Sequence, residues 1–168
     1  MEIREATPGD AFGIAKVQVK SWRTTYRDIV PNAYLEKMTY EKRVRKWKEI
    51  IHAQAVYVAV IQSEIVGFAN GGQERIGKFP GYDGELYALY ILREYQGRRI
   101  GKLLLKSIVA NLEQKNMYSM TVSVLADTQS KFFYEHLGAV ELDRCHIEIA
   151  GKSLCVLVYG WADIREIQ

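Results

Sequence analysis

The chain has 168 residues, of which 48% are hydrophobic and 26% charged, and its formal net charge is +3. These values are typical of a globular protein with one domain, here residues 1–168, and they exclude disordered, collagen-like and disulfide-scaffold chains. The apolar runs, residues 56–61 among them, are all much shorter than the roughly 20 residues that cross a membrane. Because the first residues also lack a signal-peptide pattern, we expect a soluble cytoplasmic protein with no membrane partner.

The N-terminal part of the sequence predicts one short strand followed by helices. Ile3 and Arg4 begin the strand, and Thr7 followed by Pro8 is a typical helix start. Apolar residues then recur at helical spacing, namely Phe12, Ala15, Val19 and Trp22. Two further helices are expected over residues 33–38 and 40–52.

The helix expected over residues 40–52 carries a cluster of basic side chains, namely Lys42, Arg43, Arg45, Lys46 and Lys48. Such a cluster is one way to bind nucleic acid. We interpret it as the solvated face of an amphipathic helix, with Val44, Trp47 and Ile51 pointing inward, because the total charge is nearly balanced. The sequence therefore predicts no nucleic-acid partner.

From residue 55 onward the pattern becomes typical of strands, with β-branched residues over 55–61 and a returning strand that begins at 65–69. Five glycines between residues 71 and 84 indicate a long loop. The remaining expected elements are a strand over 85–91, a helix over 99–115, a strand over 118–125, a helix over 129–136 and a hairpin over 140–149 and 154–161. This order predicts one α/β domain, with a mixed central sheet of about six to seven strands flanked by about four or five helices.

Two cysteines, Cys145 and Cys155, flank the turn of the last hairpin. In a chain without a secretion signal we expect both to be reduced thiols with a structural role. Neither has a nearby cysteine or paired histidine at metal-ligand spacing, so we expect no metal site.

Residues 89–102 run from an apolar strand through a polar loop into an amphipathic helix. The first backbone N–H groups of a helix lack intrahelical partners and carry positive partial charge, so helix N-termini bind anions. Gly97 and Gly101 let a diphosphate approach the backbone, and Arg98, Arg99 and Lys102 add full charges. The sequence has neither the glycine run of dinucleotide-binding folds nor a P-loop, which excludes both of those nucleotide sites.

The same segment resembles a known family. Residues 96–101, QGRRIG, are similar to the Q/R-x-x-G-x-G/A signature of the GCN5-related N-acetyltransferases, abbreviated GNAT. Residues 85–91 resemble the family strand just upstream, and residues 133–139, FYEHLGA, resemble the later F-Y-x-x-L-G-F element. The resemblance covers nearly the whole chain in the right order. It implies the GNAT fold, in which two neighbouring parallel strands, here 85–91 and 118–125, splay apart to hold the cofactor.

The resemblance implies transfer of an acetyl group from acetyl-CoA, as co-substrate, to an amine. The pantetheine arm would pair with the backbone of the strand that ends at residue 91, and the pyrophosphate would lie on the amides that begin the next helix. The implied cofactor-binding residues are Leu89, Tyr90, Ile91, Gln96, Gly97, Arg98, Arg99, Ile100, Gly101, Lys102, Thr128 and Tyr134.

Two positions depart from the family pattern. Arg99 replaces the first glycine of the signature, and we expect it to have a helical backbone with its N–H still facing phosphate. Thr128 stands where many relatives carry an asparagine that contacts the pantetheine arm or the adjacent strand.

Glu85 and Tyr134 are the candidate catalytic residues. An amine with a lysine-like pKa of about 10.4 is almost fully protonated at pH 7, so a base that removes the proton is useful. Glu85 begins the strand that borders the thioester, and we expect its side chain to point toward the acceptor. Tyr134 is the candidate acid for the leaving thiolate. We expect direct attack in a ternary complex, without a covalent enzyme intermediate.

The acceptor is expected to be a small-molecule or peptide amine. Residues expected to line its site are Trp22, Tyr26, Tyr34, Glu74, Asp83 and Glu85, a set of aromatics and acids that favours a cationic amine. The alternative function is a catalytically weak acyl-CoA-binding sensor or interaction module of the same fold. The edge at residues 154–161 is a candidate for strand pairing in a homodimer.

Overall fold

The computed structural model describes residues 1–167, in which seven strands pair in the order β1-β2-β3-β4-β5-β7-β6. The strands are β1 (Glu2–Glu5), β2 (Ala55–Ile61), β3 (Glu64–Gln73), β4 (Gly84–Ile91), β5 (Met120–Leu125), β6 (Val140–Ile149) and β7 (Lys152–Trp161). The helices are α1 (Ala11–Thr25), α2 (Asn32–Glu36), α3 (Tyr40–Ala53), α4 (Ile100–Gln114) and α5 (Ser130–His136), with short 3₁₀ turns at Pro8–Asp10, Arg93–Tyr95 and Ile164–Glu166. The predicted order of elements and the mixed α/β sheet are confirmed.

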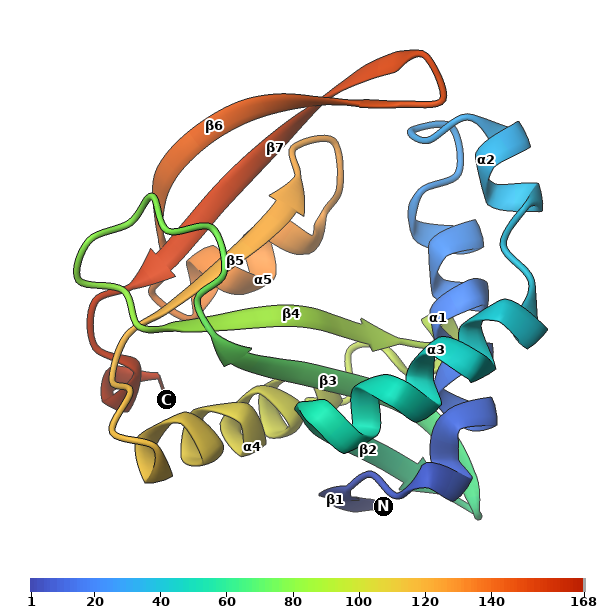
Figure 1. Cartoon of the computed structure of the whole chain (residues 1–168), viewed down its shortest axis with the longest axis horizontal. Helices are drawn as coiled ribbons and strands as arrows, with labels where there is room; N and C mark the ends of the chain where they lie inside the picture. The colour runs from blue at the N-terminus through green and yellow to red at the C-terminus, as the bar shows by residue number, and fades with distance from the viewer. Residues whose placement is uncertain (168) are drawn as a thin grey trace.

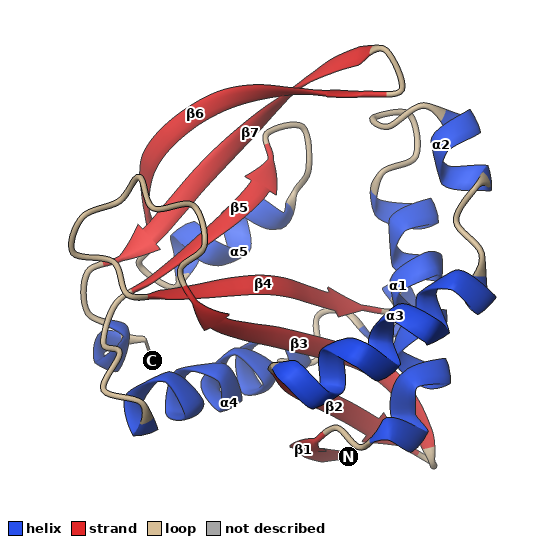
Figure 2. Ribbon diagram, viewed as in Figure 1, coloured by secondary structure: helices blue, strands red, loops and turns tan. Residues whose placement is uncertain are grey.

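The helices cover both faces of the first four strands (Figure 2). Leu104, Leu105 and Ile108 of α4 are fully buried in one core against the sheet. A second core joins α1 and α3 to the sheet, with Trp47 packed edge-on against Phe68 at 4.8 Å between ring centroids. Two apolar faces on one sheet explain why β2 is continuously apolar instead of alternating.

Glycines at positions 71 and 72 belong to β3, so the prediction of a loop starting there is wrong. Gly71 pairs with Leu86 and Gly72 with Glu85 of β4. A Cβ atom on Gly71 would lie 2.7 Å from the backbone oxygen of Glu85. The glycines therefore mark a place where two strands approach each other closely, which is a common reason for glycine within a strand.

The pairing of β4 with β5 is the one parallel contact among the described strands, and it is short. It joins Gly84–Leu86 to Met120–Val122, after which the strands separate. Figure 1 shows the two strands starting side by side and then diverging. On the other side of β4, a register shift at Asn70/Gly71 interrupts its pairing with β3. The predicted splay of two parallel strands is confirmed.

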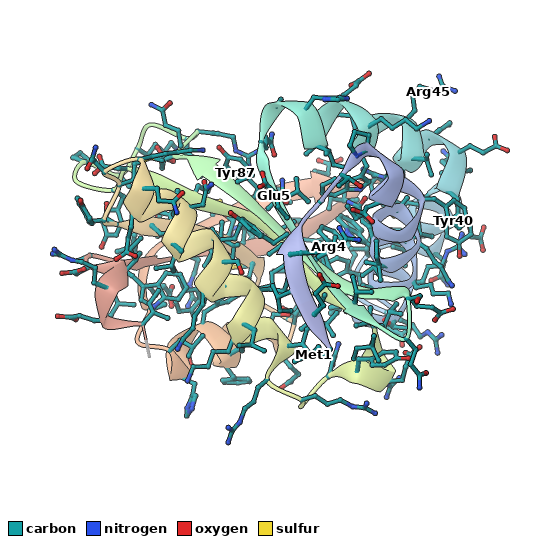
Figure 3. All side chains as sticks on the ribbon, turned by 90° about the horizontal axis from the view of Figure 1, so that it is seen from below. Met1, Arg4, Glu5, Tyr40, Arg45 and Tyr87 are labelled. Atoms are coloured by element: carbon teal, nitrogen blue, oxygen red, sulfur yellow. The ribbon has the colours of Figure 1, made fainter. Side chains whose placement is uncertain are left out.

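The basic cluster of α3 lies on its outer side, and Arg45 projects outward in Figure 3. Trp47 is buried, while Val44 and Ile51 are half-buried against the core of α1 and α3. The predicted inward face of this helix is confirmed.

The last hairpin brings the two cysteines onto paired strands, with Cys145 opposite Val156 and Cys155 opposite His146. Both thiols are free. Within residues 1–167, none of the helices has the length and apolar character needed to cross a lipid bilayer.

An ion pair fixes the N-terminal strand to the 3₁₀ turn that precedes α1. Arg4 donates two hydrogen bonds to Asp10, at 2.8 and 2.9 Å, and this contact lowers the pKa of Asp10 from 3.8 to about 2. Figure 3 labels Arg4 on β1. A carboxylate with a lowered pKa stabilises the fold at neutral pH and loses that contribution as the pH falls from about 4 to about 2.

We expect Asp10→Asn to lower the free energy of unfolding by about 1–2 kcal/mol at pH 7. The difference from the unmodified protein should disappear below about pH 2, where its Asp10 is protonated. Urea unfolding followed by circular dichroism between pH 2 and 7 measures both. The exposed Asp127→Asn is the matched control and should change little. A difference that stays constant with pH would show that charge is not the cause.

Candidate active site

The divergence of β4 and β5 opens a cleft of about 1450 Å³, called the main cleft below. Its walls are β4, the loop and first turn of α4, β5 and the segment 128–138 with α5. Every residue predicted to bind the cofactor lines this cleft except Arg98. Arg98 is exposed, with its guanidinium 5.2 Å from the ring centroid of Tyr95. The structure thus gathers residues from distant parts of the sequence around one opening.

The edge of β4 that faces the main cleft is without a strand partner beyond Leu86. Leu89, Tyr90 and Ile91 line the cleft there. Backbone N–H and C=O groups on such an edge are available to pair with an extended ligand. An extended ligand that binds along this edge would therefore take the place of a neighbouring strand.

The N-terminus of α4 opens onto the same cleft through a turn with two left-handed residues. Gly97 has φ 75° and Arg99 has φ 64°, so the expectation of a helical backbone at Arg99 is wrong. Arg99 is the residue before the helix, where the backbone need not be helical, and its carbonyl accepts the first helical bond from Leu103. A left-handed conformation costs a residue with a side chain on the order of 1 kcal/mol, a cost that a glycine avoids.

Thr128 is buried beside the main cleft, and its hydroxyl donates to the carbonyl of Leu125 at 2.9 Å. The same carbonyl accepts the Thr128 backbone N–H at 3.1 Å. The hydroxyl proton is thus used to close the turn after β5. What Thr128 offers the cleft is the acceptor capacity of its oxygen.

Three tyrosines meet between α1, β4 and α5. The hydroxyls of Tyr26 and Tyr90 lie 3.0 Å apart, and burial raises the pKa of both. The pKa of Tyr134 is also raised, first by burial and then by the nearby Tyr26. All three line the main cleft. A phenol is already protonated at neutral pH, and the raised pKa values keep all three tyrosines protonated in more alkaline solution as well.

Tyr134 is held by its neighbours in α5 and β7. Its ring lies edge-on to Phe133 and to Trp161, with centroids 5.2 and 6.0 Å apart. The side chain is only 5% exposed. Packing of this kind fixes the direction of the phenol with little rotamer freedom.

Glu85 lies at the closed end of the splay, but its side chain does not face an open acceptor site as expected. It is 4% exposed and lines neither hollow described here. Its carboxylate accepts three hydrogen bonds from Arg75: from the backbone N–H at 2.9 Å, Nη2 at 2.9 Å and Nε at 3.3 Å. The guanidinium of Arg75 also lies over the ring of Tyr87, 3.8 Å from its centroid. Glu85 therefore anchors the loop between β3 and β4.

The other two acids expected at the acceptor site are also part of this loop's structure. Glu74 accepts hydrogen bonds from the backbone of Ile76 and Gly77. Asp83 donates its backbone N–H to Ser119 Oγ at 2.8 Å. Neither acid lines a hollow described here, nor does Tyr34. No pattern in the sequence indicates that the carboxylates of Glu74 and Glu85 will form hydrogen bonds with the β3–β4 loop.

A second hollow of about 390 Å³, the apolar trough, lies on the β5-β7-β6 face under the β3–β4 loop. The expected acceptor residues Trp22 and Tyr26 line it, together with Phe79. Tyr26 and the β5 segment 123–125 line both hollows, so the trough and the main cleft adjoin. The sequence analysis did not identify the residues that β6 and β7 supply to the trough, namely Asp143, Cys145, Ile147, Ile149, Val156 and Val158.

Additional residues of the main cleft were not predicted. Phe133 and His136 come from α5, and Glu166 comes from the C-terminal turn. The pairing of β5 with β7 is what brings the C-terminal segment near the cleft, and no local pattern indicates it. In the described part of the chain, His, Cys, Asp and Glu side chains form no cluster of three that could hold a metal ion.

Comparison with known proteins agrees with this geometry. The family model for GNAT acetyltransferases matches residues 19–139. The chain is 38% identical over 167 residues to the uncharacterized N-acetyltransferase YuaI of Bacillus subtilis, covering 99% of this chain and 95% of that protein. It is 33% identical over 61 residues to the ribosomal protein bS18-alanine N-acetyltransferase of Haemophilus influenzae, covering 36% of this chain and 42% of that protein.

Solved structures share the fold. The PaiA N-acetyltransferase of Thermoplasma acidophilum in complex with coenzyme A has a TM-score of 0.74 at 23% identity, covering 92% of this chain and 96% of that one. The ribosomal-protein-alanine N-acetyltransferase of Brucella melitensis has a TM-score of 0.75 at 20% identity, covering 96% and 99%. Three observations agree, namely the splayed strands, the family match and the Bacillus relative. They show that the chain belongs to the GNAT family and is an acyltransferase.

Proposed function

We propose that this protein transfers the acetyl group of acetyl-CoA to a primary amine by direct attack within a ternary complex. The observation that carries the proposal is the main cleft itself. It joins an unpaired strand edge on β4 to the N-terminus of α4, and the apolar trough adjoins it. The first two features suit an extended arm with a diphosphate, and the third leaves room for an acceptor.

The described residues fit acetyl-CoA at both ends of the cleft. The backbone of Leu89 and Ile91 would pair with the pantetheine arm. The amides that follow Gly97, with the side chains of Arg99 and Lys102, would hold the pyrophosphate, because a helix N-terminus favours negative charge. When bound, acetyl-CoA supplies an acyl group activated as a thioester.

The residues of the chain would then move protons around the reacting atoms. A bond forms between the amine nitrogen and the acetyl carbon, the carbon–sulfur bond breaks, and the products are an acetamide and CoA. The nitrogen loses a proton to water, Tyr134 gives one to the departing sulfur, and water returns a proton to the Tyr134 phenolate. A backbone N–H near Leu89 would polarise the carbonyl oxygen.

Direct transfer is supported by the position of the thiols. A covalent acyl-enzyme needs a nucleophile within reach of the thioester. Cys145 lies on the β6 wall of the trough, and Cys155 lines neither hollow. The main cleft offers neither of them as a nucleophile.

Titration calorimetry with acetyl-CoA and with CoA, at fixed salt, tests the proposal first. We expect micromolar binding of both, followed by thiol release when a suitable amine is added. Failure to bind millimolar acetyl-CoA would overturn the proposal and would point to Arg99 as an obstacle beside the diphosphate. Binding without thiol release for any amine would favour the alternative function, an acyl-CoA sensor of the same fold.

The contact with Arg75 makes Glu85 a positioning residue in this proposal, in place of the base that the sequence predicts. We expect Glu85→Gln to lower kcat/KM roughly tenfold at every pH from 6 to 9, since the loss comes from a displaced loop. Arg75→Gln should show the same loss, because Arg75 is exposed and its main partner is Glu85. A loss in Glu85→Gln that shrinks as the pH rises would instead identify Glu85 as the base, which is needed less when the amine is already neutral.

A further inference from the structure

The apolar trough has the chemistry of a binding site for an uncharged, ring-sized group. Its walls are aromatic and aliphatic, with Trp22, Phe79, Ile147, Ile149 and Val158 among them. Its volume of about 390 Å³ falls within the range of small-molecule sites. The trough is therefore large enough for the body of a small acceptor.

Two large side chains of the trough are left open to water. Ile76 of the β3–β4 loop is 42% exposed and Ile147 of β6 is 41% exposed, and both line the trough. Burial of such apolar surface by a ligand is favourable. A polyamine would gain less from these contacts than an aromatic ring, because charged nitrogens interrupt its short methylene segments.

The charges around the trough do not favour a polycation. Its charged lining residues are Lys78 and Asp143, one of each sign. The acids Glu74 and Glu85, which could have added negative charge, are bound to the loop's own backbone and to Arg75. A site for a polyamine or an aminoglycoside needs several carboxylates to replace the water around each ammonium group.

Residues shared by the two hollows place the trough beside the main cleft. Asp143 of β6, Val158 of β7 and Ser123 of β5 lie in one row of the sheet, and all three line the trough. Ser123 and Tyr26 also line the main cleft. An amine carried on an apolar body in the trough would therefore point toward the phenols of Tyr26 and Tyr90.

We propose that the acceptor is a small molecule with one primary amine on an apolar body of aromatic size, such as an arylalkylamine. This inference rests on the proposed function and specifies its substrate class. Aromatic packing against Trp22 and Phe79 supplies the affinity, and the balanced charges of Lys78 and Asp143 exclude polycations.

Thiol release from acetyl-CoA by the full chain tests the substrate class. The matched amines are 2-phenylethylamine and tryptamine against putrescine, spermidine, kanamycin and a peptide with an N-terminal alanine. We expect kcat/KM for the arylalkylamines to exceed that for each of the other amines at least 100-fold. A preference for the polyamines, the aminoglycoside or the peptide would overturn this inference and leave the proposed function standing.

Two variants locate the site. Ile147→Ala should lower kcat/KM for 2-phenylethylamine roughly tenfold through a higher KM, because an exposed methyl surface of the trough is lost. Val140→Ala is the matched control, since Val140 is 57% exposed on the same strand and outside the trough. Equal effects of the two alanine variants would overturn the placement.

Calorimetry separates this inference from the proposed function. If acetyl-CoA binds and no amine is acetylated, 2-phenylethylamine is titrated into the complex with CoA. Saturable binding that Ile147→Ala weakens would support the trough as an arylalkylamine site. Absence of binding at millimolar amine would overturn it, whatever the outcome for catalysis.

Discussion

Replacement of Tyr134 by phenylalanine is expected to lower kcat about 10–100-fold while the affinity for acetyl-CoA changes less than twofold. The raised pKa of Tyr134 keeps its phenol protonated at neutral pH, as a donor to the departing sulfur must be. The ring itself packs against Phe133 and Trp161, and phenylalanine preserves that packing. Stopped-flow or steady-state thiol release, with calorimetry for binding, measures the two quantities separately.

A buried tyrosine outside the cleft provides the control for this experiment. Tyr159 is 2% exposed in the same core, and its hydroxyl donates to Glu135 at 2.6 Å. Tyr159→Phe should reduce stability slightly, since a hydrogen bond to a charged group is lost, and should leave kcat unchanged. If Tyr134→Phe keeps the full kcat, Tyr134 is not the proton donor.

The largest loss of stability is expected for Gly71→Ala, about 2–3 kcal/mol of the free energy of unfolding. The new Cβ would lie 2.7 Å from the backbone oxygen of Glu85 and 3.0 Å from Ile108 Cγ2. Backbone cannot move aside as a flexible side chain can, so β4 must shift relative to β3. Because the unpaired edge of β4 forms one wall of the main cleft, we also expect weaker binding of acetyl-CoA.

Gly9→Ala is the matched control, because its new Cβ would have only Thr7 Oγ1 nearby, at 3.7 Å. This substitution should change the melting temperature by less than about 2 °C, against about 5–10 °C for Gly71→Ala. Equal melting temperatures for the two variants would mean that the strands tolerate a methyl group at this position.

The sequence is most informative where a periodic pattern coincides with burial. The helix predicted over residues 99–115 is α4, and its apolar side packs into the core through Leu104, Ile108 and Leu112. The loop proposed to hold the pyrophosphate is also marked in the sequence, since glycines and basic residues lie together between a strand and a helix. In these segments, local preference and tertiary packing favour the same structure.

Sequence patterns fail where a residue's role depends on a partner far along the chain. Gly71 has the usual mark of a loop but lies within a strand, because β4 comes too close for any side chain. Arg99 adopts a glycine-like conformation that its residue type does not suggest. Glu85 is a strong candidate base by position alone, yet the conformation of the β3–β4 loop gives its carboxylate to Arg75. No local pattern contains that information.

The short pairing between β4 and β5 has a consequence for how this protein can change by mutation. Beyond Leu86 and Val122, the backbone groups of β4 and β5 do not pair with each other, and in the proposed function they are left to pair with acetyl-CoA. A substitution that lengthened this ladder by two residues on each strand would remove unsatisfied backbone groups and strengthen the sheet. The same substitution would close the enzyme to its substrate, so in this protein greater sheet regularity and greater activity are opposed.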